Sequence, residues 1–137
     1  MEFAKWTAAC SVNQVDMDAE HRVFLDTLNT LYNDLPNPSK TATFERTIQD
    51  LEDYAKKHFA HEEAMLVALD YPHIDQQQAQ HLFFRNELVK LKASVATATA
   101  YELQSVLQFM RDWFLNHILT LDKKYAKWFE ELNIEVF

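Results

Sequence analysis

The chain has 137 residues, of which 48% are hydrophobic and 13% aromatic, and its formal net charge is −8. This composition excludes a disordered chain and suits one domain, residues 1–137, with its own core. The negative charge disfavours nucleic acid and anionic membranes as partners, and no apolar run approaches the roughly 20 residues of a membrane span. Because Cys10 is the single cysteine and the first residues do not form an apolar signal segment, we expect a cytoplasmic protein.

The predicted secondary structure is all-α, because the sequence has no glycine for the tight turns that strands usually need. Residues 1–17 are expected to form an extended arm, with Asn13 in a left-handed conformation and Asp16 or Asp18 capping the next helix. Hydrophobic residues at spacings of three and four then predict four helices. The first three span about residues 18–33, 41–69 and 75–95. The fourth begins at a capping box of Thr99 and Glu102 and runs to about residue 132.

The segments between these helices are short. They are LPNPS at 35–39, DYP at 70–72 and ATATA at 96–100, and the tail NIEVF at 133–137 is expected to fold back or fray. Four amphipathic helices with short connections predict an up-down-up-down antiparallel four-helix bundle with an extended N-terminal arm.

The motif HFAHE at residues 58–62 carries the first functional signal. His58 and Glu62 are one turn apart on a helix, so they form either a surface hydrogen bond or a pair of metal ligands. The hydrophobic stripe of the predicted helix passes through both residues. An ionised carboxylate on a buried stripe is costly unless it is paired or bound to a metal ion.

Further histidines and acids fall at the same depth in the other helices. In an antiparallel bundle, the starts of the first and third helices lie beside the ends of the second and fourth. One half of the bundle therefore collects polar side chains on the inward stripes: His21, His58, Glu62, Gln77, His81, His117 and Asp122. Core carboxylates that meet core histidines indicate bound cations, and two shared carboxylates indicate two of them.

The ordered set H…HxxxE…H…HxxxxD resembles the hemerythrin-like domain family, in particular its single-domain bacteriohemerythrins. DAEH at 18–21, YP at 71–72 and MRDWFLNHILTLDKKY at 110–125 belong to the same resemblance, which covers nearly the whole chain. It implies two non-haem iron ions, oxo- or hydroxo-bridged, that bind dioxygen reversibly for transport, storage or sensing. Dioxygen is then the expected ligand and partner, and the protein is not expected to be an enzyme.

The resemblance also implies a role for each matched residue. His21 and His58 would hold the iron that binds dioxygen, and His81 and His117 would hold the other iron. Glu62 and Asp122 would bridge the two ions, since carboxylate oxygen and imidazole nitrogen are suitable iron ligands.

The spacing between His117 and Asp122 requires a local change in the fourth helix. Five residues on an ideal helix separate two side chains by about 140°. Both side chains can reach one centre if the helix widens between them, so we predict a π-bulge there.

Gln77 departs from the family pattern, which has HxxxH in the third helix. Three outcomes follow: Gln77 or a water fills the ligand position, the second metal is bound loosely or lost, or His73 bends into the site. Four other residues are interpreted as lying outside the ligand set: His61 as a partly exposed histidine behind the ligands, His73 as a loop or helix-cap residue, and Glu20 and Glu63 as solvated.

One alternative function is a di-iron redox enzyme of oxidase or peroxidase type with this altered ligand set, and another is a variant with a partly lost metal site. A metal-free phosphotransfer module is disfavoured, because no histidine lies in the HxxKG pattern of such modules. The ExxH pairs of ferritin-like proteins and the HExxH motif of zinc proteases are also absent from the sequence.

Overall fold

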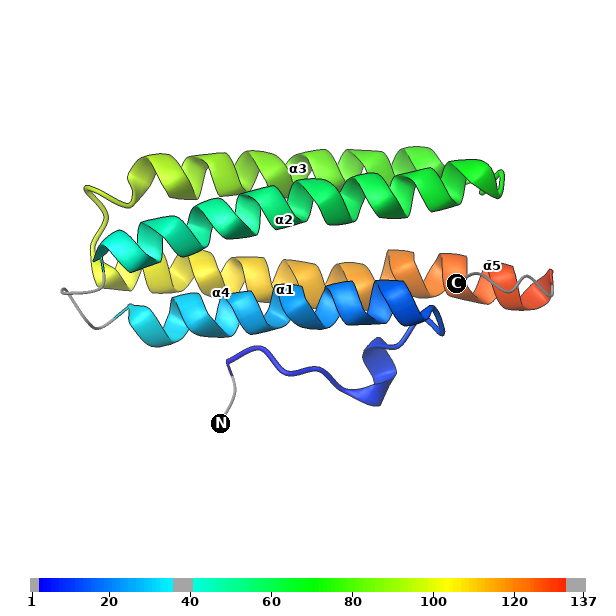
Figure 1. Cartoon of the computed structure of the whole chain (residues 1–137), viewed down its shortest axis with the longest axis horizontal. Coiled ribbons are helices and arrows are strands. Elements are labelled where there is room, and N and C mark those ends of the chain that lie inside the picture. The colour runs from blue at the N-terminus through cyan, green and yellow to red at the C-terminus, as the bar shows by residue number, and fades with distance from the viewer. Residues whose placement is uncertain (1–2, 36–40, 133–137) are drawn as a thin grey trace.

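A computed structural model describes residues 3–35 and 41–132 and shows four long helices lying side by side (Figure 1). They are α1 (Val15–Asp34), α2 (Thr41–Ala68), α3 (Ile74–Ser94) and α4 (Ala100–His117). The fourth continues through the π-helical segment η3 (Ile118–Asp122) into α5 (Lys123–Glu131). These described ranges contain no strand, so the all-α prediction is confirmed. Most of the predicted LPNPS turn and the tail at 133–137 lie outside the described residues.

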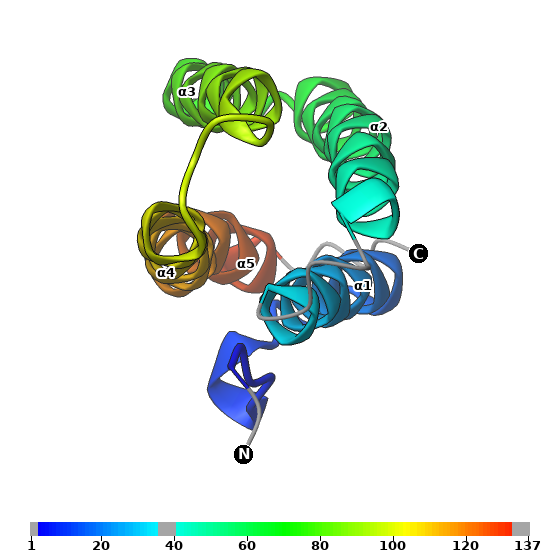
Figure 2. The same cartoon turned by 90° about the vertical axis from the view of Figure 1, so that its left-hand side faces the viewer.

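Seen from one end, the helices occupy the corners of a square (Figure 2). Helix α1 has α2 and α4 as its neighbours, and α3 lies diagonally across from α1. Successive helices run in opposite directions, which confirms the up-down-up-down bundle. Phe24, Phe84 and Phe114 bring three of the helices together in the core, where all three rings are fully buried. The ring centroids of Phe24 and Phe114 are 4.0 Å apart. Burying each such ring stabilises the bundle by roughly 1.5–3 kcal/mol.

The N-terminal arm is shorter than the predicted residues 1–17. It contains the short 3-10 helix η1 (Ala8–Cys10), which packs against η3, and α1 begins at Val15. Asn13 adopts a φ of 57°, which confirms its predicted left-handed conformation. The prediction that Asp16 or Asp18 caps α1 is wrong, because Gln14 is the N-cap and both acids lie in the first turn. Asp18 instead accepts hydrogen bonds from the arm, from the Ser11 hydroxyl (2.6 Å) and the Val12 amide (2.9 Å).

The end of α2 shows how a chain without glycine closes a helix and turns. Asp70 takes the left-handed position after α2 with a φ of 55°, and the Tyr71 amide donates back to the Leu66 carbonyl (3.0 Å). This pattern closes a helix end that glycine usually closes.

At the start of α4, the Glu102 amide donates to the Thr99 hydroxyl (3.1 Å), and this hydroxyl donates to the Glu102 carboxylate (3.2 Å). The predicted capping box is confirmed, although in a variant form in which the two side chains bond each other.

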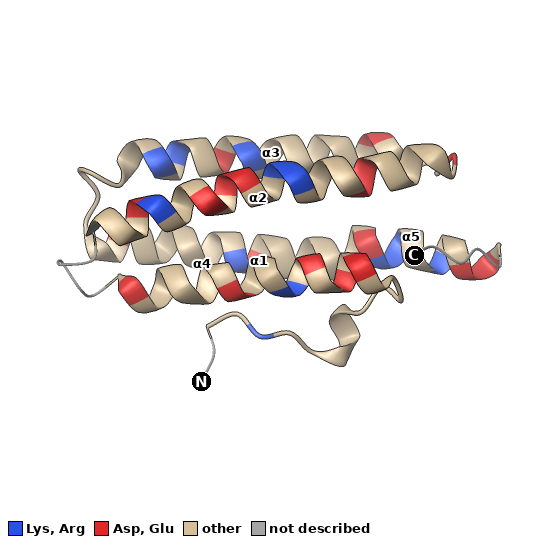
Figure 3. Cartoon of the chain, viewed as in Figure 1, with Lys and Arg blue, Asp and Glu red and all other residues tan. Residues whose placement is uncertain are grey.

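Charged side chains are mixed along α1, α2 and α3 in the view of Figure 3, where acidic and basic residues follow each other without a long basic run. This distribution agrees with the net charge of −8. None of the helices within residues 3–35 and 41–132 combines the length and hydrophobicity that a bilayer crossing needs.

Candidate metal centre

The structure buries all seven predicted site residues in one half of the bundle, and none of them is more than 2% exposed. They come from α1, α2, α3, α4 and η3: His21, His58, Glu62, Gln77, His81, His117 and Asp122. The matching of depths along antiparallel helices therefore predicted which polar side chains are buried in this half of the bundle.

Two groups of these side chains have ligand atoms close enough to hold a metal ion. One consists of His21, His58 and Glu62, and the other of Glu62, His81 and His117. Within each group the ligand atoms all lie within 4.8 Å of one another. Glu62 belongs to both groups, so the two candidate positions are adjacent.

The Glu62 carboxylate presents one oxygen to each group. Its Oε2 atom lies 3.6 Å from His21 Nε2, and its Oε1 atom lies 2.9 Å from His81 Nε2. A carboxylate in this arrangement can bridge two cations.

The Asp122 carboxylate is shared in the same way. Its Oδ2 atom lies 3.2 Å from His21 Nε2, and its Oδ1 atom lies 3.2 Å from His117 Nε2. Each half of the centre therefore faces two imidazoles and one oxygen from each of two carboxylates.

The π-helical segment η3 is what allows His117 and Asp122 to face the same centre. It spans Ile118–Asp122, directly after His117, and both side chains are buried. A π turn adds a residue to the helical turn and so realigns positions that are five apart. The π-bulge predicted from the spacing is confirmed.

The electrostatics of the site require positive charge near the two carboxylates. Burial acts to raise the pKa of Glu62, but its close polar contacts with His21 and His81 and the charges of His58 and His81 outweigh burial and lower the pKa well below its usual value. Burial and the Glu62 charge act to raise the pKa of Asp122, yet His117 and His21 lower it to about 2. Both acids therefore stay ionised inside the bundle.

The imidazoles respond to the same charges. Burial acts to lower the pKa of His21, but Asp122 and Glu62 outweigh it and raise this pKa to about 10. Burial likewise acts to lower the pKa of His81, and Glu62 raises it. In the absence of metal, protons on these imidazoles balance the negative charge of the buried carboxylates. A metal ion that binds to the imidazole nitrogens must displace those protons.

Unpaired buried atoms show that the residues fit metal ions. The Nε2 atoms of His21, His81 and His117 have no hydrogen-bond partner of suitable geometry, nor do Glu62 Oε1 and Asp122 Oδ2. Buried polar atoms are normally satisfied, and five of them converging here call for a shared partner. Nitrogen and carboxylate oxygen together suit iron and other first-row transition metals.

Two acids outside the predicted set orient the histidines. His58 Nδ1 donates to Glu20 (2.7 Å), and His81 Nδ1 donates to Glu63 (2.8 Å). The interpretation of Glu20 and Glu63 as solvated is wrong, because these bonds hold them against the bundle. Such carboxylate–histidine pairs direct the other ring nitrogen toward the metal. The signal available in the sequence was that each acid directly neighbours a proposed ligand, His21 or Glu62.

Tyr125 is a further residue whose role the sequence analysis missed. Its hydroxyl donates to Glu62 Oε2 (2.9 Å), and the side chain is fully buried. Tyr125 lies three residues after Asp122 and so shares its helix face, which was the signal for it. The hydrogen bond fixes the orientation of the Glu62 carboxylate.

Aromatic rings surround the imidazoles. The Phe59 ring stacks on His81 with a centroid distance of 4.0 Å, and the Trp113 ring stacks on His117 at 4.9 Å. The edge of Phe114 meets His21 at 5.6 Å. These contacts hold the ring planes and exclude water from the centre.

Gln77 lies inside the centre with its side chain 1% exposed. Its Nε2 atom donates to Asp122 Oδ1 (2.8 Å), whereas its Oε1 atom is buried without a hydrogen-bond partner. His73 is the N-cap of α3, which confirms its interpretation as a helix-cap residue, and it belongs to neither metal group, so the alternative in which it bends into the site is not observed. His61 is half exposed and bonds Glu20 (2.7 Å).

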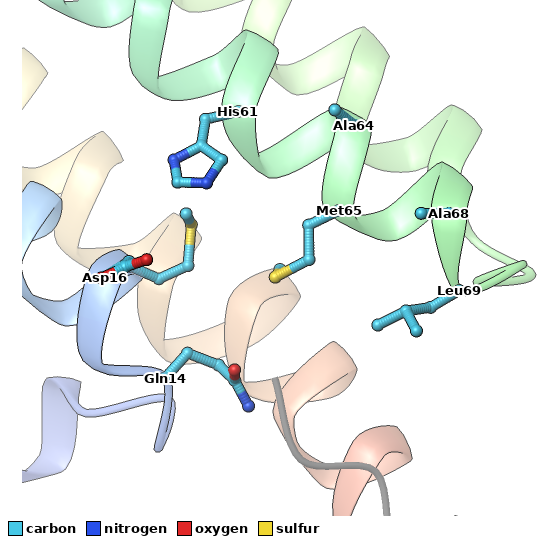
Figure 4. A pocket seen from close by; sticks show the side chains of 8 residues that line it. Gln14, Asp16, His61, Ala64, Met65, Ala68 and Leu69 are labelled. Carbon is cyan, nitrogen blue, oxygen red and sulfur yellow. The ribbon is translucent and has the colours of Figure 1, made fainter. Parts of the chain in front are cut away.

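A cavity of about 340 Å³ lies beside this half of the bundle, between the start of α1 and the end of α2 (Figure 4). None of the seven predicted residues lines it. His61 does, and it is linked to the centre because Glu20 bonds both His61 and His58. The remaining lining residues are Gln14, Asp16, Met17, Ala64, Met65, Ala68 and Leu69.

Comparison with known proteins gives a consistent result. Residues 14–129 match the family model described as the Hemerythrin HHE cation binding domain. The chain is 28% identical over 127 residues to Bacteriohemerythrin from Methylococcus capsulatus, covering 92% of this chain and 96% of the relative. It is 30% identical to Myohemerythrin-1 from Phascolopsis gouldii, over 79% of this chain and 88% of the relative. A solved structure of wild-type hemerythrin superposes with a TM-score of 0.81 at 25% identity, covering 91% and 96% of the two chains.

Proposed function

The chain belongs to the hemerythrin family, and from this premise we propose that it holds two non-haem iron ions and binds dioxygen reversibly, as a carrier, store or sensor. The observation that carries the proposal is the sharing of Glu62 and Asp122, each with one oxygen toward either half of the centre. The proposal places this centre in one domain, residues 1–137, of a cytoplasmic protein.

Each residue has a defined part in this centre. His21 and His58 would hold one ion, His81 and His117 would hold the other, and Glu62 and Asp122 would bridge them. Gln77, bonded to Asp122, lies where the second ion would take either its amide oxygen or a water. Bound iron would supply the electrons that dioxygen takes up on binding.

The surrounding side chains prepare the site for a small neutral ligand. Glu20 and Glu63 accept from the outer nitrogens of His58 and His81 and so keep the inner nitrogens directed at the centre. The buried rings of Phe59 and Phe114 keep bulk water away, which favours an apolar ligand and protects the centre from side reactions. Tyr125 holds Glu62 in place from the same interior.

The test is the iron content and visible spectrum of the protein, reconstituted with iron without oxygen and then cycled between air and argon. We expect two irons per chain and a spectrum that changes reversibly over several cycles. Glu62→Gln should abolish the dinuclear spectrum, whereas the matched surface variant Glu45→Gln should retain it.

Two results would contradict the proposal. One is a wild-type chain with fewer than two irons. The other is a permanent spectral change on first exposure to air. Steady consumption of dioxygen or peroxide with an added reductant, without a stable oxygenated form, would instead select the redox-enzyme alternative.

A further inference from the structure

Gln77 is the residue that makes the two halves of the centre different. Each half faces two imidazoles and one oxygen from each of two carboxylates. Gln77 adds an amide to the second half, from the buried face of α3. His81 lies one turn later on the same face of this helix, so the two side chains approach the same position.

The hydrogen bond to Asp122 determines how the amide is oriented. Gln77 Nε2 donates to Asp122 Oδ1, and this is the carboxylate oxygen that lies 3.2 Å from His117 Nε2. The amide nitrogen and oxygen are bonded to one carbon. Anchoring the nitrogen on Oδ1 therefore keeps the amide oxygen close to the carboxylate oxygen that His117 faces.

The amide oxygen at this position lacks a partner. Gln77 Oε1 is buried without a hydrogen bond, in a side chain that is 1% exposed. His81 Nε2 and His117 Nε2, which belong with Glu62 to the second group of candidate metal ligands, also lack hydrogen-bond partners. A cation held by this group and reached by the amide would satisfy the two nitrogens and the amide oxygen together.

We propose that Gln77 Oε1 is a ligand of the second cation and shifts this half of the centre toward harder divalent ions such as Mn²⁺. The inference rests on the proposed dinuclear centre. With Gln77, the second half offers two nitrogen and three oxygen donors. Carbonyl and carboxylate oxygens suit Mn²⁺, whereas imidazole increasingly favours the later metals of the first row. The Asp122 hydrogen bond holds the amide so that its oxygen, not its nitrogen, meets the ion.

The test compares stepwise Mn²⁺ and Co²⁺ binding by equilibrium dialysis in the full chain and in variants of α3. Wild-type protein should bind two ions of either metal per chain. Gln77→Leu should weaken one of the two Mn²⁺ steps at least tenfold and leave the other unchanged. Gln77→His should raise the Co²⁺ affinity of one binding step. This increase should be at least ten times the increase in Mn²⁺ affinity at the same step.

Matched controls are Gln78→Leu and Gln80→His, which make the same changes at exposed positions of α3 and should behave as wild type. Thermal unfolding of each metal-free variant shows whether it is folded. Because Gln77→His and Gln77→Leu predict opposite changes at the same step, the failure of one variant to fold does not remove the test.

Three outcomes would overturn the inference. Gln77→Leu could bind both ions like wild type, or it could weaken both steps equally, which would mean that Gln77 acts through the shared Asp122 alone. Gln77→His could raise Mn²⁺ and Co²⁺ affinity by the same factor. Fewer than two Co²⁺ per wild-type chain would overturn the dinuclear centre as well. Two Co²⁺ per chain without reversible dioxygen binding by the iron form would count against the proposed function alone.

Discussion

Metal binding to this centre is expected to release protons. The pKa of His21 is about 10 in the metal-free protein, because attraction from Asp122 and Glu62 outweighs its burial. At pH 7 the protonated form therefore predominates by about a thousandfold. An imidazole must lose its proton to bind a metal through that nitrogen. His81, whose pKa is also raised, contributes to the release.

The number of protons released follows from the raised pKa values of His21 and His81. Filling both positions near pH 8 should release between about one and two protons from His21 and His81. Each released proton makes the apparent metal affinity rise about tenfold per pH unit, so the affinity should rise at least about a hundredfold from pH 7 to pH 9.

Stability should change with pH in a related way. The raised pKa of His21 stabilises the metal-free fold fully below its usual value of 6.5, and this contribution is lost as the pH rises through about 10. The lowered pKa of Asp122 stabilises the fold above its usual value of 3.8, and this contribution is lost as the pH falls through about 2. Both contributions are fully present between pH 3.8 and pH 6.5, so metal-free protein should be most stable in this range.

Isothermal calorimetry of Co²⁺ binding at pH 8, in buffers of different ionisation enthalpy, measures the released protons directly. His21→Gln should release about one proton fewer than wild type, if it still binds metal, whereas the matched variant His61→Gln should be unchanged. A binding heat that does not depend on the buffer would refute the reasoning, since it would mean that the imidazoles are neutral before metal arrives.

Three further predictions concern the surroundings of the centre. Glu63→Ala removes the acceptor of His81 Nδ1 and should lower Co²⁺ affinity about 10–100-fold in dialysis; unchanged affinity would show that Glu63 does not orient this ligand. Thr99→Ala removes the cap of α4 and should lower the free energy of unfolding by about 1 kcal/mol in urea without changing metal content, and a loss of metal would contradict this separation. Asp70→Gly relieves the left-handed backbone after α2 and should raise the free energy of unfolding by up to about 1 kcal/mol, whereas a decrease would show that the Asp70 side chain itself stabilises the turn.

Most of the candidate centre could be predicted from the sequence because helical periodicity is a local property. The spacing of His58 and Glu62 places both on one face, and the five-position separation of His117 and Asp122 requires the π turn that the structure contains. Antiparallel order then brings the ends of successive helices to one level, and the seven residues meet inside the bundle.

Other contacts could not be predicted because they depend on which residues meet between helices. Glu20 and Glu63 lie beside the inward stripe, and only the distance between adjacent helices decides whether each reaches a histidine on its neighbour. Asp18 has the right residue type for a helix cap, but the path of the arm brings Ser11 and Val12 to it instead.

The sequence by itself determined the helices, the inward face of each and the residue types that this face carries, because these follow from spacing along a single segment. Only the tertiary structure decided which oxygen of Glu62 and Asp122 faces which imidazole, and that the Gln77 nitrogen rests on Asp122. These pairings depend on the rotation and depth of one helix against another, which side chains from the whole bundle set together through packing.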